Sequence, residues 1–423
     1  MINKLKSIAN TEDKKRLLSN FFSLSVLQGT NYILPLITVP YLVRVLGVEY
    51  FGLLAFATTT VTFFSILTDY GFNLTATREI SVHRDNKEKV IEIFSSVMTI
   101  KFILMFVSFF LLAILVFSFE KFSQDWLVYF LTFGTVIGQV LFPIWFFQGM
   151  ERMKYTTYLN LLAKFIFTIA IFVFVKEPSD FLIVPLLTSI GFFVAGTWSL
   201  YLVRKEFKVR FELQSVEAIK YHFTEGWHIF IAGLFTLTYT ISIPFVLGIF
   251  TNNLVLGYFS LADKIIKALI NVSSPLSQTI FPYVNNLIST SQQKAKIFLL
   301  KILALSSLIM LSISILAFIY SSNIILLIAG ENIPEAELIL KILSILPFVI
   351  TVARILSNNY IVSFGYKKNM SRIYFYSSLI SLPMMFFLIP LHEAVGASLT
   401  MIVVETFATL YMIVFIRNKI RFI

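Results

Sequence analysis

The sequence predicts an all-α integral membrane protein with about twelve transmembrane helices, and three observations lead to this fold class. Of the 423 residues, 57% are hydrophobic and only 13% are charged, too few charged groups to cover a soluble protein of this size. Several apolar stretches run for about twenty residues or more, long enough to cross a hydrocarbon layer of about 30 Å. Stretches such as Ile100–Phe117 do not alternate between polar and apolar residues, which disfavours β-barrel strands.

Twelve spans follow one another along the chain, most of them separated by short polar loops. They cover residues 17–44, 50–72, 90–118, 126–149, 155–175, 181–203, 227–250, 254–288, 297–320, 336–363, 373–390 and 394–416. Six spans fall in each half, which predicts an N-terminal lobe over residues 1–210 and a C-terminal lobe over residues 211–423.

Prolines fall inside seven of these spans. They are Pro35 and Pro40 in the first, Pro143 in the fourth, Pro185 in the sixth, Pro244 in the seventh, Pro275 and Pro282 in the eighth, Pro347 in the tenth and Pro383 in the eleventh. Because proline removes a backbone hydrogen bond, each is expected to interrupt or bend its helix. Broken helices are common in transporters and in other membrane proteins.

Loop charges predict the orientation. With the N-terminus in the cytoplasm, 24 of the 34 lysines and arginines fall in cytoplasmic segments, and only Arg44, Lys121 and Lys176 fall outside. This bias predicts that both termini are cytoplasmic. The net charge of +11 is therefore attributed to membrane topology, and no nucleic-acid partner is expected.

The two halves share a weak internal repeat. Residues 40–57 read PYLVRVLGVEYFGLLAFA and residues 244–262 read PFVLGIFTNNLVLGYFSLA, so that Pro40 aligns with Pro244 and Gly52 with Gly257 after a one-residue slip. With six spans in each half, both halves enter the membrane in the same direction. A repeat of this kind predicts a two-fold axis along the membrane normal and a central cavity between the lobes. Chance similarity between apolar segments is the alternative.

Charged residues inside the spans are the candidate functional residues. The deep cations are Lys101, Lys164, Lys264, Lys267 and Arg354, and the acids are Asp263 and Glu405, with Asp69 at the inner end of the second span. Each buried charge costs about 2.5–3.5 kcal/mol at a helix centre. Asp263 and Lys267 are four residues apart and can form a structural pair. The surplus cations require a hydrated cavity or an anionic ligand, and phosphate or pyrophosphate is the natural partner.

Several chemistries lack their residues. The chain has no cysteine and no GxxxxGK[ST] loop, and its four histidines are not at a zinc-binding spacing. No catalytic residue, metal or cofactor is therefore expected. Membrane polymerases of polysaccharides usually carry a large outer domain, whereas the longest outer segment here, around 321–337, is short. An enzyme is disfavoured on this ground.

Four stretches resemble the Wzx-type O-antigen flippases, the polysaccharide transporter branch of the multidrug/oligosaccharidyl-lipid/polysaccharide exporter superfamily. They are residues 20–47, residues 51–81 with the run TDYGFNLTATR, residues 145–160 with the run FFQGMERMKY, and residues 257–286. The resemblance implies two six-helix lobes that give alternating access to a central cavity. It also implies an undecaprenyl-diphosphate-linked oligosaccharide as substrate, moved to the outer leaflet of the bacterial inner membrane for O-antigen or capsule assembly.

Under this resemblance, Lys101, Lys164, Lys264, Lys267 and Arg354 hold the pyrophosphate and its sugars. Arg44 acts at the exit, or is a simple interfacial arginine. Asp263, Glu405 and Asp69 are candidates for H+ or Na+ coupling, with an ion pair as the alternative for Asp263. Membrane lipid, a polymerase and a chain-length regulator are the implied partners. A multidrug or cation antiporter of the same superfamily and a membrane polysaccharide polymerase remain alternatives.

Overall fold

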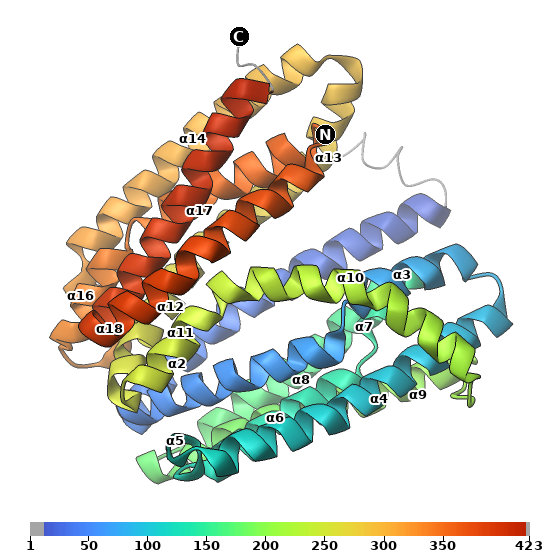
Figure 1. Ribbon diagram of the computed structural model, residues 1–423, viewed down its shortest axis with the longest axis horizontal. Helices are drawn as coiled ribbons and strands as arrows, with labels where there is room; N and C mark the ends of the chain where they lie inside the picture. The colour runs from blue at the N-terminus through green and yellow to red at the C-terminus, as the bar shows by residue number, and fades with distance from the viewer. Residues whose placement is uncertain (1–11, 420–423) are drawn as a thin grey trace. The chain divides into compact units, whose positions relative to one another are not determined.

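The protein is predominantly helical over its described length. The computed structural model describes the backbone of residues 12–419 and all their side chains except those of residues 12–28, 30–33, 232, 235–240, 275, 278–279, 282 and 367. Within this range every regular element is a helix, which confirms the predicted all-α class (Figure 1).

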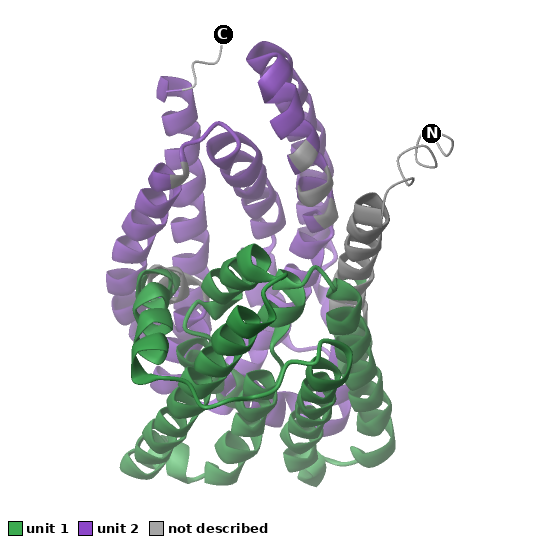
Figure 2. Cartoon of the chain, turned by 90° about the vertical axis from the view of Figure 1, so that its right-hand side faces the viewer, with its two compact units in different colours: residues 1–38, 57–233 green, residues 39–56, 234–423 purple. Residues whose placement is uncertain are grey.

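The chain is divided into two compact units. Residues 1–38 and 57–233 make up unit 1, and residues 39–56 and 234–423 make up unit 2 (Figure 2). The chain therefore passes between the units after residues 38, 56 and 233. The predicted lobes of six spans each, 1–210 and 211–423, stay a prediction.

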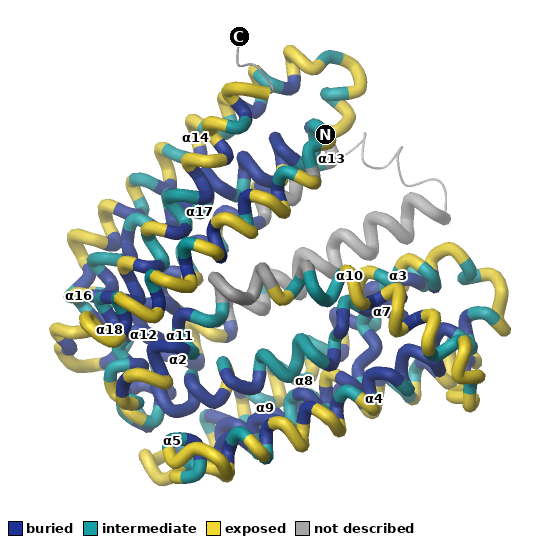
Figure 3. The backbone as a smooth tube through the Cα atoms, viewed as in Figure 1, coloured by how far each residue is buried: buried dark blue, intermediate teal, exposed yellow. Residues whose placement is uncertain are grey.

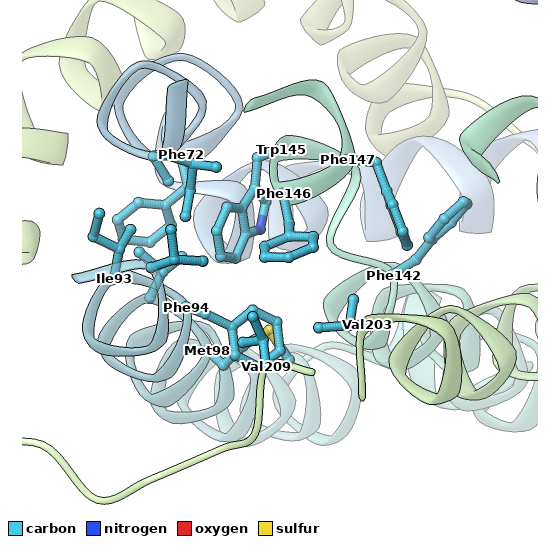
Figure 4. Close-up of a cluster of buried hydrophobic side chains, with 14 of the residues drawn as sticks. Phe72, Ile93, Phe94, Met98, Phe142, Trp145, Phe146, Phe147, Val203 and Val209 are labelled. Atoms are coloured by element: carbon cyan, nitrogen blue, oxygen red, sulfur yellow. The ribbon is translucent and has the colours of Figure 1, made fainter. Parts of the chain in front are cut away.

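Unit 1 contains most of the helices in the first half of the chain. They are part of α2 (Glu12–Asp69), then α3 (Phe72–His83), α4 (Lys87–Ser118), α5 (Glu120–Ser123), α6 (Trp126–Leu141), α7 (Ile144–Gly149), α8 (Met153–Phe174), the short 3-10 helix η1 (Pro178–Leu182), α9 (Ile183–Glu206) and the first part of α10 (Val216–Thr240). Its core gathers aromatic side chains of α4 and α7, with Trp145 and Phe146 fully buried beside Phe94 (Figure 4). This core fixes α7 against α4.

Unit 2 contains the remaining helices. They are α11 (Ser242–Phe250), α12 (Asn253–Asn271), α13 (Ser274–Thr290), α14 (Gln292–Ile319), α15 (Ser321–Ala329), α16 (Pro334–Leu343), α17 (Leu346–Arg354), the π-helix η2 (Ile355–Val362) and α18 (Lys367–Lys419). Its core packs α13 and α14 onto η2 and α18, through side chains such as Leu299, Tyr360 and Met412.

Exposed apolar side chains mark the surfaces that face lipid. On α4, Val97 and Met98 are buried, whereas Phe106 and Phe110 are 59% and 64% exposed. Figure 3 shows buried and exposed residues alternating along this helix. Exposed apolar area on this scale is typical of a membrane surface. Eight stretches of the described chain are long and apolar enough to cross a membrane, and the count of twelve spans stays a prediction.

Two long helices contain sharp breaks that divide them. In α2 the break is at Gly47, with φ 78°, and in α18 it is at Glu393, with φ 48°. Both residues fall in loops predicted between spans, after residues 44 and 390. Each long helix therefore supplies two successive apolar segments.

Proline positions agree with the predicted helix breaks at some sites and not at others. Pro143 lies between α6 and α7, and Pro347 is the second residue of α17, which follows shortly after the end of α16. Pro185 lies in the first turn of α9, where a missing N–H has little cost. The expectation that Pro35 and Pro40 interrupt the first span was wrong, because α2 continues through both and breaks only at Gly47.

The two glycines aligned by the repeat contact each other's segment inside unit 2. A Cβ on Gly52 would come within 1.9 Å of the Asn253 carbonyl oxygen, and a Cβ on Gly257 within 2.2 Å of the Val48 carbonyl oxygen. Gly257 and Gly52 are 205 positions apart, and so are Asn253 and Val48. Reciprocal contacts of this kind are typical of a local two-fold axis, and they match the predicted repeat offset of about 205.

Candidate functional site

In unit 1 a buried lysine is paired with the carboxylate that ends the second span. Lys101 of α4 is 4% exposed, and its Nζ lies 3.7 Å from Oδ1 of Asp69. The Asn73 side-chain amide donates to the same oxygen at 2.8 Å. A lysine held in an apolar bundle needs such a partner, because a lone buried charge is costly. Lys101 and Asp69 were both predicted site residues, and the structure brings them together as a pair.

The turn after Asp69 is held by an aromatic stack. Tyr70 and Gly71 both adopt positive φ, 48° and 81°, which directs the chain from α2 into α3. The Tyr70 ring lies between Phe223 and Phe230 of α10, with ring centroids 4.6 and 4.9 Å away. The left-handed backbone at Tyr70 costs about 1–2 kcal/mol, and the stacked rings offset it. The Tyr70 ring of the run TDYG thereby packs α10 against the end of α2.

Lys164 lies on a different helix from this pair. It is in the middle of α8, and its side chain is half-buried. It remains a site residue by prediction only.

In unit 2 the predicted pair on α12 is formed. Lys267 Nζ lies 2.6 Å from Asp263 Oδ2, while the other carboxylate oxygen of Asp263 is buried and lacks a hydrogen-bond partner among the described residues. One turn of the helix separates the two residues, as their spacing predicted. The Lys267 side chain is 51% exposed.

Lys264 presents a second cation on the same helix. Its side chain is exposed, and Nζ lies 4.5 Å from the centre of the Phe51 ring. Phe51 is itself 2% exposed, so the ring is a fixed support. An ammonium over an aromatic face is held electrostatically without losing its ability to bind an anion. Lys264 and Lys267 thus give α12 one more positive charge than Asp263 balances.

Arg354 binds the end of α12. Its Nη1 donates to the Ile270 carbonyl at 3.2 Å and to Ser273 Oγ at 3.0 Å, and Thr351 Oγ1 donates to the same Ser273 oxygen at 2.9 Å. The carbonyl end of a helix carries partial negative charge, which stabilises a guanidinium there. Arg354 therefore lies at the C-terminal end of the helix that carries Lys264 and Lys267.

A polar group on the π-helix was not among the predicted site residues. Asn359 is fully buried, and its Nδ2 donates to Ser277 Oγ at 3.0 Å, while Oδ1 lacks a partner in the described part of the chain. π-helical turns are often found at functional sites. The run Ser357–Asn358–Asn359 inside an apolar span was the sequence signal that could have identified it.

Glu405 and Arg44 are the remaining predicted site residues. Glu405 is half-buried on the second part of α18, and no cation among the described residues forms an ion pair with it. Arg44 is exposed, and its guanidinium donates to the Ile328 carbonyl through Nε at 3.1 Å and to the Leu327 carbonyl through Nη2. Arg44 therefore caps the C-terminus of α15.

The described residues contain no cluster of three or more His, Asp or Glu that could hold a metal ion. The geometry is that of paired and supported charges in apolar helices. Such charges can bind an anion or a proton, and they do not assemble a nucleophile with a base.

Comparison with known proteins gives the family. Residues 17–288 match the family model described as "Polysaccharide biosynthesis protein". The chain belongs to this family. A family relative from Escherichia coli (strain K12), named "Putative O-antigen transporter", is 31% identical over 96% of this chain and 98% of its own length. A relative of the same name from Shigella dysenteriae is 26% identical over 93% and 98%.

Solved structures of other proteins share the fold of this chain. An inward-facing multidrug resistance MATE family transporter of the MOP superfamily matches 95% of this chain and 98% of its own, with a TM-score of 0.74 and 13% identity. The lipid II flippase MurJ, in an inward closed conformation, matches 93% and 87%, with a TM-score of 0.67 and 14% identity. The chain therefore has the MOP-superfamily fold, as the sequence resemblance implied.

Proposed function

We propose that this protein flips an undecaprenyl-diphosphate-linked oligosaccharide repeat unit from the cytoplasmic to the outer leaflet of the bacterial inner membrane. It does so by alternating access, with both termini in the cytoplasm, for assembly of O-antigen or capsule. The names of the two relatives support a transport role, and the lipid II flippase shows that this fold can move a lipid-linked substrate.

The observation that carries the proposal is the pair of exposed lysines on α12. Lys264 and Lys267 belong to an element with apolar neighbours, and only Asp263 balances them. A lysine facing lipid at this depth would cost about 2.5–3.5 kcal/mol, so these side chains face water. A hydrated passage with surplus positive charge binds the diphosphate, and Arg354 adds a guanidinium at the end of the same helix.

The membrane potential supplies part of the driving force. With the inside negative, outward movement of an anion is favoured by about 2.3 kcal/mol per charge per 100 mV. A diphosphate that crosses uncompensated gains about twice that amount. Consumption of the product outside, by a polymerase, draws the reaction in the same direction.

Glu405 is the carboxylate that we propose for ion coupling. Asp69 is paired with Lys101 and Asp263 with Lys267. Glu405 has no ion pair with a described cation, so its proton or Na+ occupancy is not fixed by a neighbouring positive charge.

The test is a flipping measurement on Lys264→Gln/Lys267→Gln. Purified protein in liposomes is given a fluorescent undecaprenyl-diphosphate oligosaccharide, and headgroup accessibility is followed. We expect a fall in rate of about tenfold or more, because each lost charge-assisted contact is worth about 1.5–3 kcal/mol. Lys294→Gln/Lys368→Gln removes the same charge from exposed positions and should leave the rate unchanged. A normal rate in the first variant would remove both lysines from the mechanism.

A multidrug antiporter is the second candidate, because the MATE transporter shares the fold with a TM-score of 0.74. The same liposomes distinguish it. Efflux of a cationic dye under an ion gradient, without movement of the lipid-linked oligosaccharide, would select the antiporter. The surplus of lysine on α12 disfavours it, since like charges repel a cationic substrate.

A further inference from the structure

A concave basic pocket lies at one end of unit 1, apart from the charges inside the spans. It encloses about 530 Å³. Its charged lining residues are Lys87 of α4, Arg204 and Lys205 at the end of α9, and Lys208, Arg210 and Glu212 of the segment that follows. Five cations thus face one carboxylate. A hollow with this excess of positive charge is suited to a phosphate group.

Residues 207–212, which line one side of the pocket, are fixed to the core of unit 1. Val209 is 3% exposed and packs with the buried side chains of α4 (Figure 4). The Glu212 N–H donates at 3.0 Å to Ser95 Oγ of α4, and the Phe207 ring packs edge-on against Phe146 at 5.2 Å. Lys208 and Arg210, on either side of Val209, are exposed and line the pocket.

The backbone at Lys208 is strained. Its φ is +56°, a conformation that residues with a side chain avoid. Strain of this kind persists where the surrounding contacts impose it, and it is concentrated at functional sites. Here the packing of Phe207 and Val209 in the core holds the Lys208 backbone in this conformation. The Lys208 side chain then lines the pocket.

An apolar stripe leads along α9 to the pocket. Ile190, Val194, Trp198 and Tyr201 follow at intervals of four, four and three residues, so they lie on one helix face. They are 47%, 39%, 53% and 54% exposed. Arg204 and Lys205 continue this face by one further turn, and Lys205 Nζ lies 5.5 Å from the Tyr201 ring centre. An acyl chain would lie on the stripe while its headgroup occupies the pocket.

We infer that this pocket binds the phosphate of an anionic phospholipid of the cytoplasmic leaflet. Basic pockets at the cytoplasmic membrane surface recognise such headgroups, and a soluble phosphate would make no use of the stripe. The inference rests on the proposed orientation, which places residues 204–212 in the cytoplasm. It does not depend on which molecule is transported.

The experiment uses the full chain in detergent and titrates dioleoylphosphatidylglycerol, with retained lipid counted by native mass spectrometry. The pocket variant is Arg204→Gln/Lys208→Gln/Arg210→Gln. The matched control, Lys294→Gln/Lys368→Gln/Arg372→Gln, removes three positive charges from exposed positions of unit 2. We expect lipid affinity about tenfold or more weaker in the pocket variant, and no change in the control. Equal thermal unfolding of the three proteins shows that the fold is intact.

Four outcomes would overturn the inference. Equal loss of lipid from the pocket variant and the control would indicate surface charge alone. Equal retention of phosphatidylcholine by the wild type would show that charge is not recognised. Displacement of the lipid by an equal concentration of inorganic phosphate would assign the pocket to a soluble anion. Preferential retention of an undecaprenyl-diphosphate lipid would assign it to the transported molecule. Flipping activity is measured separately, so that a failed lipid site and a failed flippase are told apart.

Discussion

Four of the predicted site cations are each held by a defined neighbour. Lys101 has Asp69, Lys267 has Asp263, Lys264 has the ring of Phe51, and Arg354 has the end of α12. These arrangements divide the predicted site residues into two kinds. A cation that is buried with its carboxylate, as Lys101 is, is first of all part of the fold, whereas a cation with an exposed side chain, such as Lys264 or Lys267, can bind a ligand.

Removal of the Asp69 carboxylate tests whether the buried pair with Lys101 stabilises the fold. Asp69→Asn leaves the Lys101 ammonium buried beside a neutral group, and breaking a buried pair is strongly destabilising. Because the Asp69 side chain is 34% exposed, we expect a loss of about 2 kcal/mol, below the usual range for fully buried pairs. Thermal unfolding in detergent measures it.

The double variant Lys101→Met/Asp69→Asn should recover most of this stability, because no charge is left unpaired. If it also flips lipid at the normal rate, Asp69 has no coupling role. A double variant that is no more stable than Asp69→Asn would contradict the pairing.

His222 gives a pH-dependent contribution to stability. It lies in α10 before the predicted seventh span, is 3% exposed, and its Nε2 has no partner among the described residues. Burial lowers its pKa from the ordinary 6.5, against the raising effect of Glu92 and Glu79. Lys89 also lowers it, and Glu225 raises it. The unfolded chain therefore binds more protons below about pH 6.5, and this part of the stability is lost as the pH falls through that region.

We expect the unfolding temperature to fall from pH 7 to pH 5 less steeply in His222→Gln than in the wild type. His392→Gln, at an exposed position, is the control and should keep the full slope. Identical slopes in all three proteins would show that His222 is not titrating differently in the folded and unfolded states.

At the scale of elements, turns and helix ends determine where the charged groups lie. The turn at Tyr70 and Gly71 sets the exit of the chain from α2 and docks the first part of α10. Gly226 makes this possible, because a Cβ there would come within 2.6 Å of the Tyr70 ring. Tyr70 and Gly71 of the run TDYG therefore have a structural role at this turn.

Replacement of Tyr70 tests the aromatic stack. Tyr70→Ala removes a ring that is 2% exposed, and we expect a loss of about 3–5 kcal/mol, as for other large-to-small core changes. Tyr70→Phe keeps the ring and removes a hydroxyl that lacks a hydrogen-bond partner in the described structure, so stability should be equal or slightly higher. Thermal unfolding compares them, and an equal loss in both variants would show that the hydroxyl, not the ring, stabilises α10.

The breaks between helices could be predicted only where a local cause exists. Gly47 and Pro143 mark breaks because their backbone preferences are local. The π-helix Ile355–Val362 could not be predicted, because an extra residue per turn has no sequence signature. Pro35 and Pro40 failed as markers, since neighbouring contacts can hold a proline-containing helix together.

At the scale of the whole molecule, the composition was sufficient to predict an all-α membrane protein. It was insufficient to predict which site residues contact one another. The membrane fold follows from apolar length, and the Asp263–Lys267 pair follows from helical spacing. The pairing of Lys101 with Asp69 and the contact of Lys264 with Phe51 could not be predicted, because each joins helices far apart in the chain. The resemblance to flippases identified the family, and the match over residues 17–288 confirmed it.

The three passages of the chain between the units have a consequence for genetics. Residues 39–56 belong to unit 2 although they are encoded in the first half of the gene. Within that segment, Arg44 caps α15, Phe51 supports Lys264, and Val48 and Gly52 make the reciprocal contacts with Asn253 and Gly257. A truncated polypeptide that starts near residue 211 would lack all of these groups. We therefore expect two separately expressed halves to complement each other only if the first fragment supplies residues 39–56 to the second.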